Sequence, residues 1–395
     1  MFSERVPGQL RANRLASAVA ARRAAGHELL DLTDSNPTRA GVAYPPALLA
    51  PMGDPRGLRY EPQPFGLQAA RQAVSDDYAR RGVSLGADRV VLTPSTSDAY
   101  GWLFKLLADP GSEVLVPRPS YPLFEHLTRL DGVVARPYEL EYHGTWSIDF
   151  ASLEAALSPR TRAVLLVSPN NPTGSFVKQP ELDRLAGLCE RRDIAVIADE
   201  VFADYELEAG ATAAAGRVLD RRDVLAFSLG GLSKSVGLPQ VKLGWIGVAG
   251  PAPLVASALE RLELVCDTYL SVSTPVQASA AELLVAGAAV RAAIAERVRA
   301  NFRVLVDRVA GTPSCSVLRP EGGWSGVIQV PSLQPEEDLV LMLLARDGVL
   351  VHPGYFFDFP RESYLIVSLL PPPAIFDEGI GRVLRHFDCS GTNHE

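Results

Sequence analysis

Six short apolar runs alternate with helix-like stretches between residues 82 and 250. In chain order they are residues 89–92, 113–116, 163–167, 194–197, 224–227 and 243–248. Consecutive apolar positions are typical of strands buried on both faces of a parallel sheet. The helical patterns between the runs predict crossover connections and an α/β fold. Ligands bind such sheets at the carboxyl ends of the strands, so the residues that follow each run are candidates for chemistry.

The two ends of the chain differ from this middle part. Residues 5–26 are rich in Ala and Arg, which favours an amphipathic helix bearing Leu10, Leu15 and Val19, before a strand at 29–32. A transit peptide has a similar composition and stays open as a second interpretation. Helical sequence over 275–309, followed by short strand-like runs at 326–330, 349–351 and 364–367, predicts a smaller α+β domain. We expect an N-terminal arm that joins the small domain (1–45), a large domain (46–275) and a small C-terminal domain (276–395).

Composition and charge narrow the possible partners. Of the 395 residues, 47% are apolar and 21% are charged, and the formal net charge is −8. An acidic chain lacks the basic face that binds phosphate backbones, so we expect no nucleic-acid partner. No apolar run reaches the ~18 residues of a membrane span, so we expect no membrane partner. The four cysteines are far apart and form no Cys–His cluster, which indicates no metal site and a cytoplasmic protein.

Polar residues with possible chemistry follow five of the apolar runs. They are Ser95, Thr96 and Ser97, then Tyr121, then the segment Ser-Pro-Asn-Asn-Pro-Thr-Gly at 168–174, then Asp199, then Lys234. A hydroxyl-rich helix start can bind an anion, and a buried carboxylate needs a cation. A lysine activated by its surroundings can form a Schiff base. Taken one by one, each segment also has a simpler explanation: a helix cap, loop packing, a turn, a salt bridge and a solvated lysine.

In this order the segments resemble the fold type I, class I/II aminotransferases, the aspartate aminotransferase family, from Leu29 to the C-terminus. Two motifs are specific: the 168–174 segment, and Ser233-Lys234 followed by Gly-Leu-Pro at 237–239 and Leu-Gly-Trp at 243–245. Tyr60 with Gly66, Asp-Glu-Val at 199–201, and Gly-Val at 348–349 with Pro-Gly at 353–354 match more weakly. The resemblance implies the PLP (pyridoxal 5'-phosphate)-dependent transferase fold. That fold has a mostly parallel seven-stranded sheet in a large domain and a smaller α+β domain.

The resemblance also implies roles for these residues around the cofactor PLP. Lys234, next to Ser233, would form the internal aldimine and then act as general base and acid at the substrate Cα. Asp199 would keep the pyridine nitrogen protonated, which makes the ring an electron sink. Asn171 would hydrogen-bond the ring O3', and Tyr121 would stack on the ring.

Other implied contacts lie at the edge of this site. Ser95, Thr96 and Ser97 would bind the cofactor phosphate. Tyr60 would reach the phosphate of a neighbouring subunit, which implies a homodimer with shared active sites. Ser35, followed by Asn36 and Arg39, lies where the family's N-terminal segment passes over the substrate.

Three positions depart from the family pattern. Lys242 stands where a phosphate-binding arginine is expected, so the charge is kept but the bidentate fork is lost. Phe202 stands where a tyrosine would donate to O3'. Ile366 stands where an arginine would grip the substrate α-carboxylate, and no Arg or Lys occurs from Tyr364 to Gly381. Arg39 is then the candidate replacement for that arginine.

Three functions remain in competition. The first is transfer of an amino group between an L-amino acid and a 2-oxo acid. The second is another PLP reaction, such as β-elimination by a C–S lyase or an oxidase-like reaction, which the missing tyrosine and arginine favour. The third is a PLP-binding regulator, but such regulators carry a DNA-binding domain, and this acidic chain lacks the basic face for one.

Overall fold

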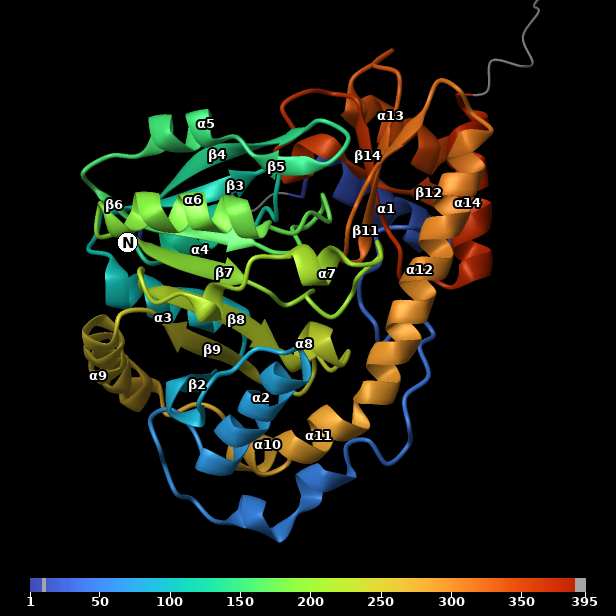
Figure 1. Ribbon diagram of the computed structural model, residues 1–395. Coiled ribbons are helices and arrows are strands. Elements are labelled where there is room, and N and C mark those ends of the chain that lie inside the picture. The colour runs from blue at the N-terminus through green and yellow to red at the C-terminus, as the bar shows by residue number, and fades with distance from the viewer. Residues whose placement is uncertain (9–11, 388–395) are drawn as a thin grey trace, which may run out of the picture.

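In the computed structural model, which describes residues 1–8 and 12–387, an eight-stranded sheet forms the centre of the larger part of the molecule (Figure 1). Its strand order is β2-β9-β8-β7-β6-β3-β4-β5. The strands are β2 (Val90–Thr93), β3 (Glu113–Arg118), β4 (Val134–Tyr142), β5 (Trp146–Ile148), β6 (Thr161–Val167), β7 (Ala195–Asp199), β8 (Ala226–Gly231) and β9 (Gly244–Ala249). Each of the six apolar runs coincides with part of a strand. The α/β class is therefore confirmed.

The sheet differs from the prediction in two details. It has eight strands rather than seven, because the three residues of β5 form an antiparallel hairpin with β4. In addition, β9 runs antiparallel to both of its neighbours, β8 and β2. A strand buried on both faces is apolar whichever way its neighbours run, so the pattern could not give this direction. The pairs β3–β4, β3–β6, β6–β7 and β7–β8 are parallel, so the sheet is mostly parallel as expected.

Helices cover both faces of this sheet. One layer comprises α3 (Thr96–Leu107), α4 (Phe124–Leu130) and α9 (Ala252–Tyr269), and the opposite layer comprises α5 (Phe150–Ala156) and α6 (Gln179–Glu190). Along β6, Leu165 and Val167 belong to the core under α3 and α9, whereas Val164 and Leu166 belong to the core under α6. This alternation is the side-chain period of a strand, and it explains why both faces are apolar.

The C-terminal part forms a second, smaller sheet. Its order is β10 (Ser316–Leu318), β11 (Ser325–Gln329), β14 (Tyr364–Ser368) and β13 (His352–Pro353), with antiparallel neighbours throughout. Next to it β1 (Leu30–Asp31) pairs in parallel with β12 (Val349–Leu350), so the N-terminal arm joins this part. Its helices are α1 (Arg14–Ala24), α12 (Ala288–Ala310), α13 (Glu336–Met342) and α14 (Pro373–Arg385). The domain boundaries given above stay a prediction.

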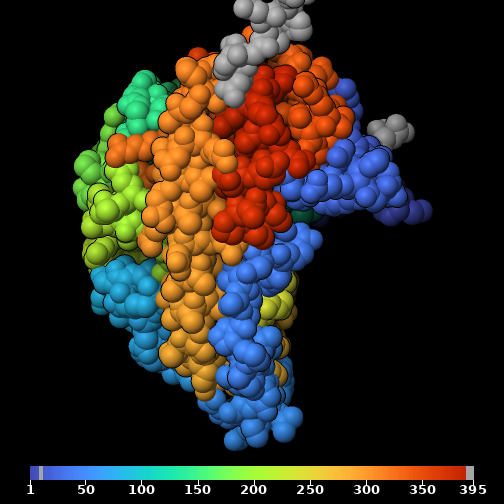
Figure 2. All heavy atoms as spheres, turned by 90° about the vertical axis from the view of Figure 1, so that its right-hand side faces the viewer, coloured from blue at the N-terminus to red at the C-terminus, as the bar shows by residue number. Residues whose placement is uncertain are grey.

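A long helix connects the two parts. Figure 2 shows the orange segment that contains α12 and, below it, the shorter helices that precede it; α14 (red) packs beside the upper part of α12. The single helix predicted for 275–309 is instead α10 (Thr274–Ala278), α11 (Ala280–Ala286) and α12, broken at Ser279 and Gly287. The remaining helices are α2 (Gln68–Arg80), α7 (Ala211–Ala214), α8 (Leu232–Ser235), η1 (Ala50–Gly53), η2 (Pro55–Leu58), η3 (Ala87–Arg89), η4 (Val218–Asp220), η5 (Leu343–Asp347) and η6 (Gly354–Phe357).

The N-terminal helix and the cysteines can be followed only in part. Leu15 is buried on α1, while Leu10 and Cys389 lie outside the described residues. Cys189 and Cys266 are buried free thiols. Within residues 1–8 and 12–387, no helix has the length and apolarity to cross a membrane.

Gly174, the last residue of the 168–174 segment, lies where the two parts of the molecule meet. Its carbonyl accepts hydrogen bonds from the backbone N–H groups of Glu321 and Gly322, both at 2.9 Å. Its φ is +70°, and a Cβ added there would lie 2.5 Å from Cβ of Pro320 and 2.6 Å from the Gly322 carbonyl oxygen. Only glycine combines this backbone conformation with such a close approach.

We predict that Gly174→Ala lowers the free energy of unfolding by about 1–3 kcal/mol more than Gly144→Ala does, because overpacking adds to backbone strain. Gly144 is a matched control, since its φ is +83° and a Cβ added there would have no atom within 4 Å. Urea unfolding of both variants, followed by circular dichroism, measures the difference. Equal losses would show that the contact with Pro320 and Gly322 does not constrain this turn.

Candidate active site

A cavity of about 310 Å³ lies where the carboxyl ends of β6 and β7 meet the start of α3 and the C-terminal sheet. Eight of the residues predicted for the site line it. They are Ser35, Thr96, Ser97, Tyr121, Asn171, Asp199, Phe202 and Lys234. Segments far apart in the sequence therefore converge on one space, as the strand-end argument requires.

Six other predicted residues do not line this cavity. Ser95 and Ser233 lie beside residues that do. Lys242 is exposed, with a left-handed φ of +61°. Tyr60 is 70% exposed. Asn36 accepts hydrogen bonds from Thr38, and Arg39 is exposed and paired with Asp34 at 3.2 Å. The suggestion that Arg39 replaces the missing arginine has no support from this arrangement.

Asp199 ends β7 and is half-buried at the edge of the cavity. Its Oδ2 accepts a hydrogen bond from the Tyr100 hydroxyl at 3.0 Å, and its Oδ1 accepts one from the Val201 backbone N–H at 3.1 Å. Burial raises the pKa of Asp199 to about 6, although these hydrogen bonds and the Lys234 charge act in the opposite direction. Because a partly buried carboxylate is stabilised by a cation, this position suits a protonated ring nitrogen.

Lys234 lies in α8, the short helix that follows β8, and is half-buried as well. Burial lowers the pKa of Lys234 below its ordinary value, and the Asp199 carboxylate opposes this shift. Its Nζ lies 5.6 Å from the ring centre of Phe202 and 5.1 Å from that of Trp324. A lysine with a lowered pKa has more of the neutral amine, which is the nucleophile in Schiff-base chemistry.

The backbone that carries Lys234 is fixed by Tyr205. The Tyr205 hydroxyl donates to the carbonyl oxygens of Lys234 at 2.5 Å and Ser235 at 3.3 Å. Tyr205 follows β7, so this contact ties the loop after Asp199 to the lysine helix. Its hydroxyl is engaged with the backbone and does not replace the donor that Phe202 lacks.

The start of α3 supplies an anion site beside this pair. Ser95 is the N-cap, and its Oγ accepts from the Asp98 backbone N–H at 3.1 Å and donates to the Asp98 carboxylate at 2.6 Å. Thr96 and Ser97 line the cavity in the first turn. The free N–H groups and positive end of a twelve-residue helix suit a phosphate.

Several residues of the cavity were not found from the sequence. Trp324, Ser325, His352 and Ser368 line it from the C-terminal part, and Thr33 lines it from the N-terminal arm. The Ser325 hydroxyl donates to Oδ1 of Asn171 at 3.1 Å, which orients that amide. Tyr100 was also missed, although its position four residues after Thr96 on the helix at the site is a usable signal. No described residue with a guanidinium group lines the cavity, and Ile366 faces it from β14.

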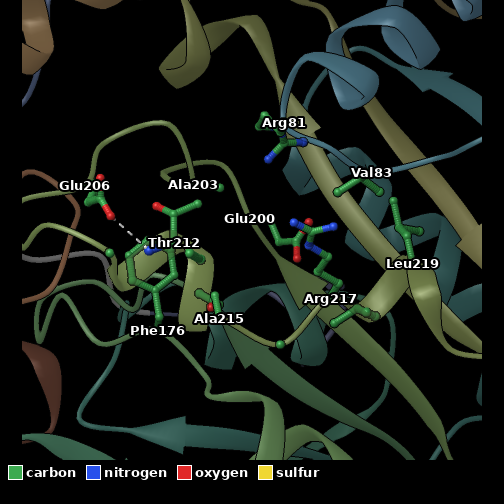
Figure 3. A pocket seen from close by; sticks show the side chains of 15 residues that line it. Arg81, Val83, Phe176, Glu200, Ala203, Glu206, Thr212, Ala215, Arg217 and Leu219 are labelled. Atoms are coloured by element: carbon green, nitrogen blue, oxygen red, sulfur yellow. Dashed lines mark hydrogen bonds between the residues drawn. The ribbon is translucent and has the colours of Figure 1, made fainter.

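A second cavity, about 430 Å³, lies behind the same strand ends (Figure 3). Residues that are adjacent in the sequence line different cavities: Asp199 and Phe202 line the first, whereas Glu200 and Ala203 line the second. Arg81 and Arg217 extend toward the buried Glu200 carboxylate in Figure 3. The second cavity has no lysine among its described lining residues, so the smaller cavity is the candidate active site.

Comparison with known proteins agrees with this geometry. Residues 35–374 match the family model for aminotransferase class I and II. The alanine aminotransferase of Mycobacterium tuberculosis strain H37Rv is 28% identical over 365 residues, covering 88% of this chain and 83% of the relative. An arginine–pyruvate transaminase of Pseudomonas aeruginosa is 30% identical over 309 residues, covering 77% and 76%.

Solved structures give the same fold. The alanine aminotransferase from Pyrococcus furiosus superposes with a TM-score of 0.85 at 22% identity, covering 95% of this chain and 99% of that one. The family model spans most of the chain, and the half-buried lysine, half-buried carboxylate and helix-start anion site together suit PLP. The chain belongs to the class I and II aminotransferase family and is a PLP-dependent transaminase.

Proposed function

We propose that Lys234 holds PLP covalently, that Asp199 faces its ring nitrogen, and that the enzyme exchanges amino groups between apolar amino acids and pyruvate. The observation that carries this proposal is that Lys234 and Asp199, both with pKa values shifted by desolvation, line the same cavity. Thr96 and Ser97 would bind the phosphate, Tyr121 would cover the ring, and Asn171 would bind the ring O3'. Ser95 and Ser233 would support these contacts from behind.

When bound, PLP supplies an electron sink that makes the Cα–H bond of an amino acid acidic. The residues of this chain do the rest. The Nζ of Lys234, whose pKa burial lowers from its ordinary value, can accept a proton from the substrate and return it. The Asp199 carboxylate stabilises positive charge on the ring nitrogen. Phe202 and Trp324, whose ring centres lie 5.2 Å apart, exclude water from the space beside Nζ.

The substrate class follows from the walls of the cavity and from the relatives. Leu123, Phe356, Phe357 and Ile366 line the cavity and give part of its wall an apolar character. An apolar wall favours apolar side chains through the hydrophobic effect. Pyruvate is proposed as the partner because the relatives include an alanine aminotransferase and an arginine–pyruvate transaminase. These names also favour transamination over elimination or a regulatory role.

The holoenzyme mixed with single amino acids tests this function. We expect L-alanine and other apolar amino acids to convert the cofactor to its pyridoxamine form. The conversion should be seen as loss of the absorbance of the lysine-bound cofactor, together with formation of the matching 2-oxo acid. Lys234→Ala should show neither conversion nor a borohydride-reducible link to the protein. Release of ammonia with pyruvate in place of transfer would indicate elimination, and a reducible link on another lysine would overturn the assignment of Lys234.

The role of Asp199 can be tested without turnover. Its pKa of about 6 means that it is ionised above this pH and neutral below it. The affinity of the apoenzyme for PLP should therefore fall as pH is lowered from 8 to 5. Below pH 6 the wild-type affinity should fall by up to tenfold for each pH unit because Asp199 becomes protonated. The affinity of Asp199→Asn should lack this part of the fall, since its side chain does not titrate. Titration of both apoproteins with PLP across this range, read by fluorescence quenching, measures the difference; parallel curves would exclude contact with the ring nitrogen.

We further propose a homodimer with shared active sites, located in the cytoplasm. Large apolar side chains are exposed on two neighbouring elements: Leu58 and Tyr60 at the end of η2, and Tyr269 and Leu270 where α9 ends. The helix α10, which follows Leu270, packs against η2. The contact brings the end of α9 and the end of η2, with their exposed apolar side chains, to the same part of the molecule. Exposed apolar groups gathered in this way mark an interface. The buried free thiols of Cys189 and Cys266 suit a reducing compartment, and fractionation of the native host would test this location.

Hybrid dimers test the exchange of Tyr60 between subunits. If Tyr60 reaches the phosphate of the neighbouring site, Tyr60→Phe and Lys234→Ala subunits place both defects in one of the two sites of the hybrid. The other site is then intact, so verified hybrids should regain about half of the wild-type activity per dimer. Activity no higher than the sum of the two parent variants, or a monomer in analytical ultracentrifugation, would contradict the shared site.

A further inference from the structure

The substrate carboxylate lacks its expected partner in this cavity. Every amino acid and 2-oxo acid carries a carboxylate, and placing that charge in a buried site is costly without a cation or hydrogen-bond donors. The strand position that would hold an arginine is Ile366, which is 2% exposed. Among the described residues that line the cavity, only Lys234 and His352 can become cations. Lys234 is committed to the cofactor, which leaves His352.

His352 lies one strand away from the arginine position. The strands β13 and β14 are antiparallel, and His352 is directly opposite Ile366. Directly opposed residues project from the same face of a sheet, and both side chains line the cavity. The imidazole lies next to two aromatic rings, with its ring centre 5.8 Å from that of Phe356 and 5.8 Å from that of Phe357.

The imidazole also has an unused polar atom. Nδ1 of His352 is buried and has no hydrogen-bond partner among the described residues. A buried polar atom without a partner costs about 1–3 kcal/mol, so its retention calls for a ligand or a similar explanation. Ser368, two residues along β14 from Ile366, also lines the cavity. We infer that His352 binds the α-carboxylate of the substrate, in the role for which Ile366 leaves no arginine.

The charge state of His352 depends on its surroundings. Burial lowers its pKa below the ordinary value, and the Asp31 carboxylate on β1 opposes this shift. On the elements packed against β13, Glu336 of α13 accepts from the N–H groups of Tyr355, Ser363 and Tyr364, while Glu337 and Asp338 pair with Arg14. Tyr355 and Tyr364 are the titratable residues of η6 and β14, and Asp199 and Lys234 line the cavity with His352. A carboxylate arriving at His352 therefore favours uptake of a proton.

Pairs of unreactive ligands isolate the carboxylate. Propionate and propionamide, and 3-phenylpropionate and 3-phenylpropionamide, have nearly the same shape and differ in charge. Of the two carboxylates, the one that wild-type holoenzyme binds more tightly should have a dissociation constant at least tenfold lower than that of its amide, as measured by isothermal titration calorimetry. His352→Phe keeps a planar ring next to Phe356 and Phe357, but it should weaken carboxylate binding by about 10- to 150-fold, the scale of a hydrogen bond to a charged group. Amide binding should change less than threefold.

Controls separate recognition from structure. His352→Gln, which keeps a donor without the charge, should give an intermediate loss and covers the case in which His352→Phe fails to fold. His126→Gln alters an exposed histidine of α4 and should change nothing. Adding Ile366→Arg to either His352 variant should restore the preference for the carboxylate.

The inference rests on the proposed function, yet the two can fail separately. Equal weakening of acid and amide in the His352 variants, or an unchanged preference, would overturn the role of His352 even in an active transaminase. An absence of preference in the wild type would overturn it as well. A carboxylate preference that depends on His352 in an enzyme that converts no amino acid would instead leave the subsite standing and refute the reaction.

Discussion

The active site depends on two opposite charges that are partly withdrawn from water after neighbouring strands. Asp199 ends β7, and Lys234 follows β8, which pairs with β7 in parallel. Burial moves their pKa values toward each other, up to about 6 for Asp199 and downward for Lys234, and each charge partly offsets the shift of the other. In water both groups would be fully charged near neutral pH. In this cavity each is closer to exchanging a proton, which is the condition for acid–base chemistry.

The surrounding structure maintains this arrangement through contacts from three directions. Tyr100 of α3 donates to Asp199, and Tyr205 donates to the backbone of Lys234. From the C-terminal part, Trp324 packs edge-to-face on both Phe202 and Tyr205, with ring centres 5.2 and 5.0 Å away. The C-terminal part therefore closes the site with an aromatic side chain. Without it, water would reach Nζ of Lys234, and the lowered pKa that burial produces would be lost.

The sequence predicts best those site residues that directly follow a buried strand. The buried strands are long apolar runs, and the residues after them, such as Asn171, Asp199 and Lys234, are close together for a topological reason. The sequence predicts least well the residues that reach the site from short or distant elements. His352 sits in a strand of two residues, too short for any periodicity, and Trp324 precedes a strand without a recognisable motif. The direction of β9 was missed because a strand covered on both faces is apolar in either orientation.

If His352 takes the role of an arginine at the position of Ile366, as proposed above, the resting site changes as well as the bound one. A buried guanidinium cannot lose its charge, so an empty site must supply a carboxylate or solvent to stabilise it. An imidazole whose pKa is lowered by burial can stay neutral next to phenylalanine rings until an anion arrives. This neutral state allows Ile366, Phe356 and Phe357 to form one continuous apolar wall. Such a wall is compatible with apolar substrates, whereas a permanent positive charge beside it would favour acidic ones.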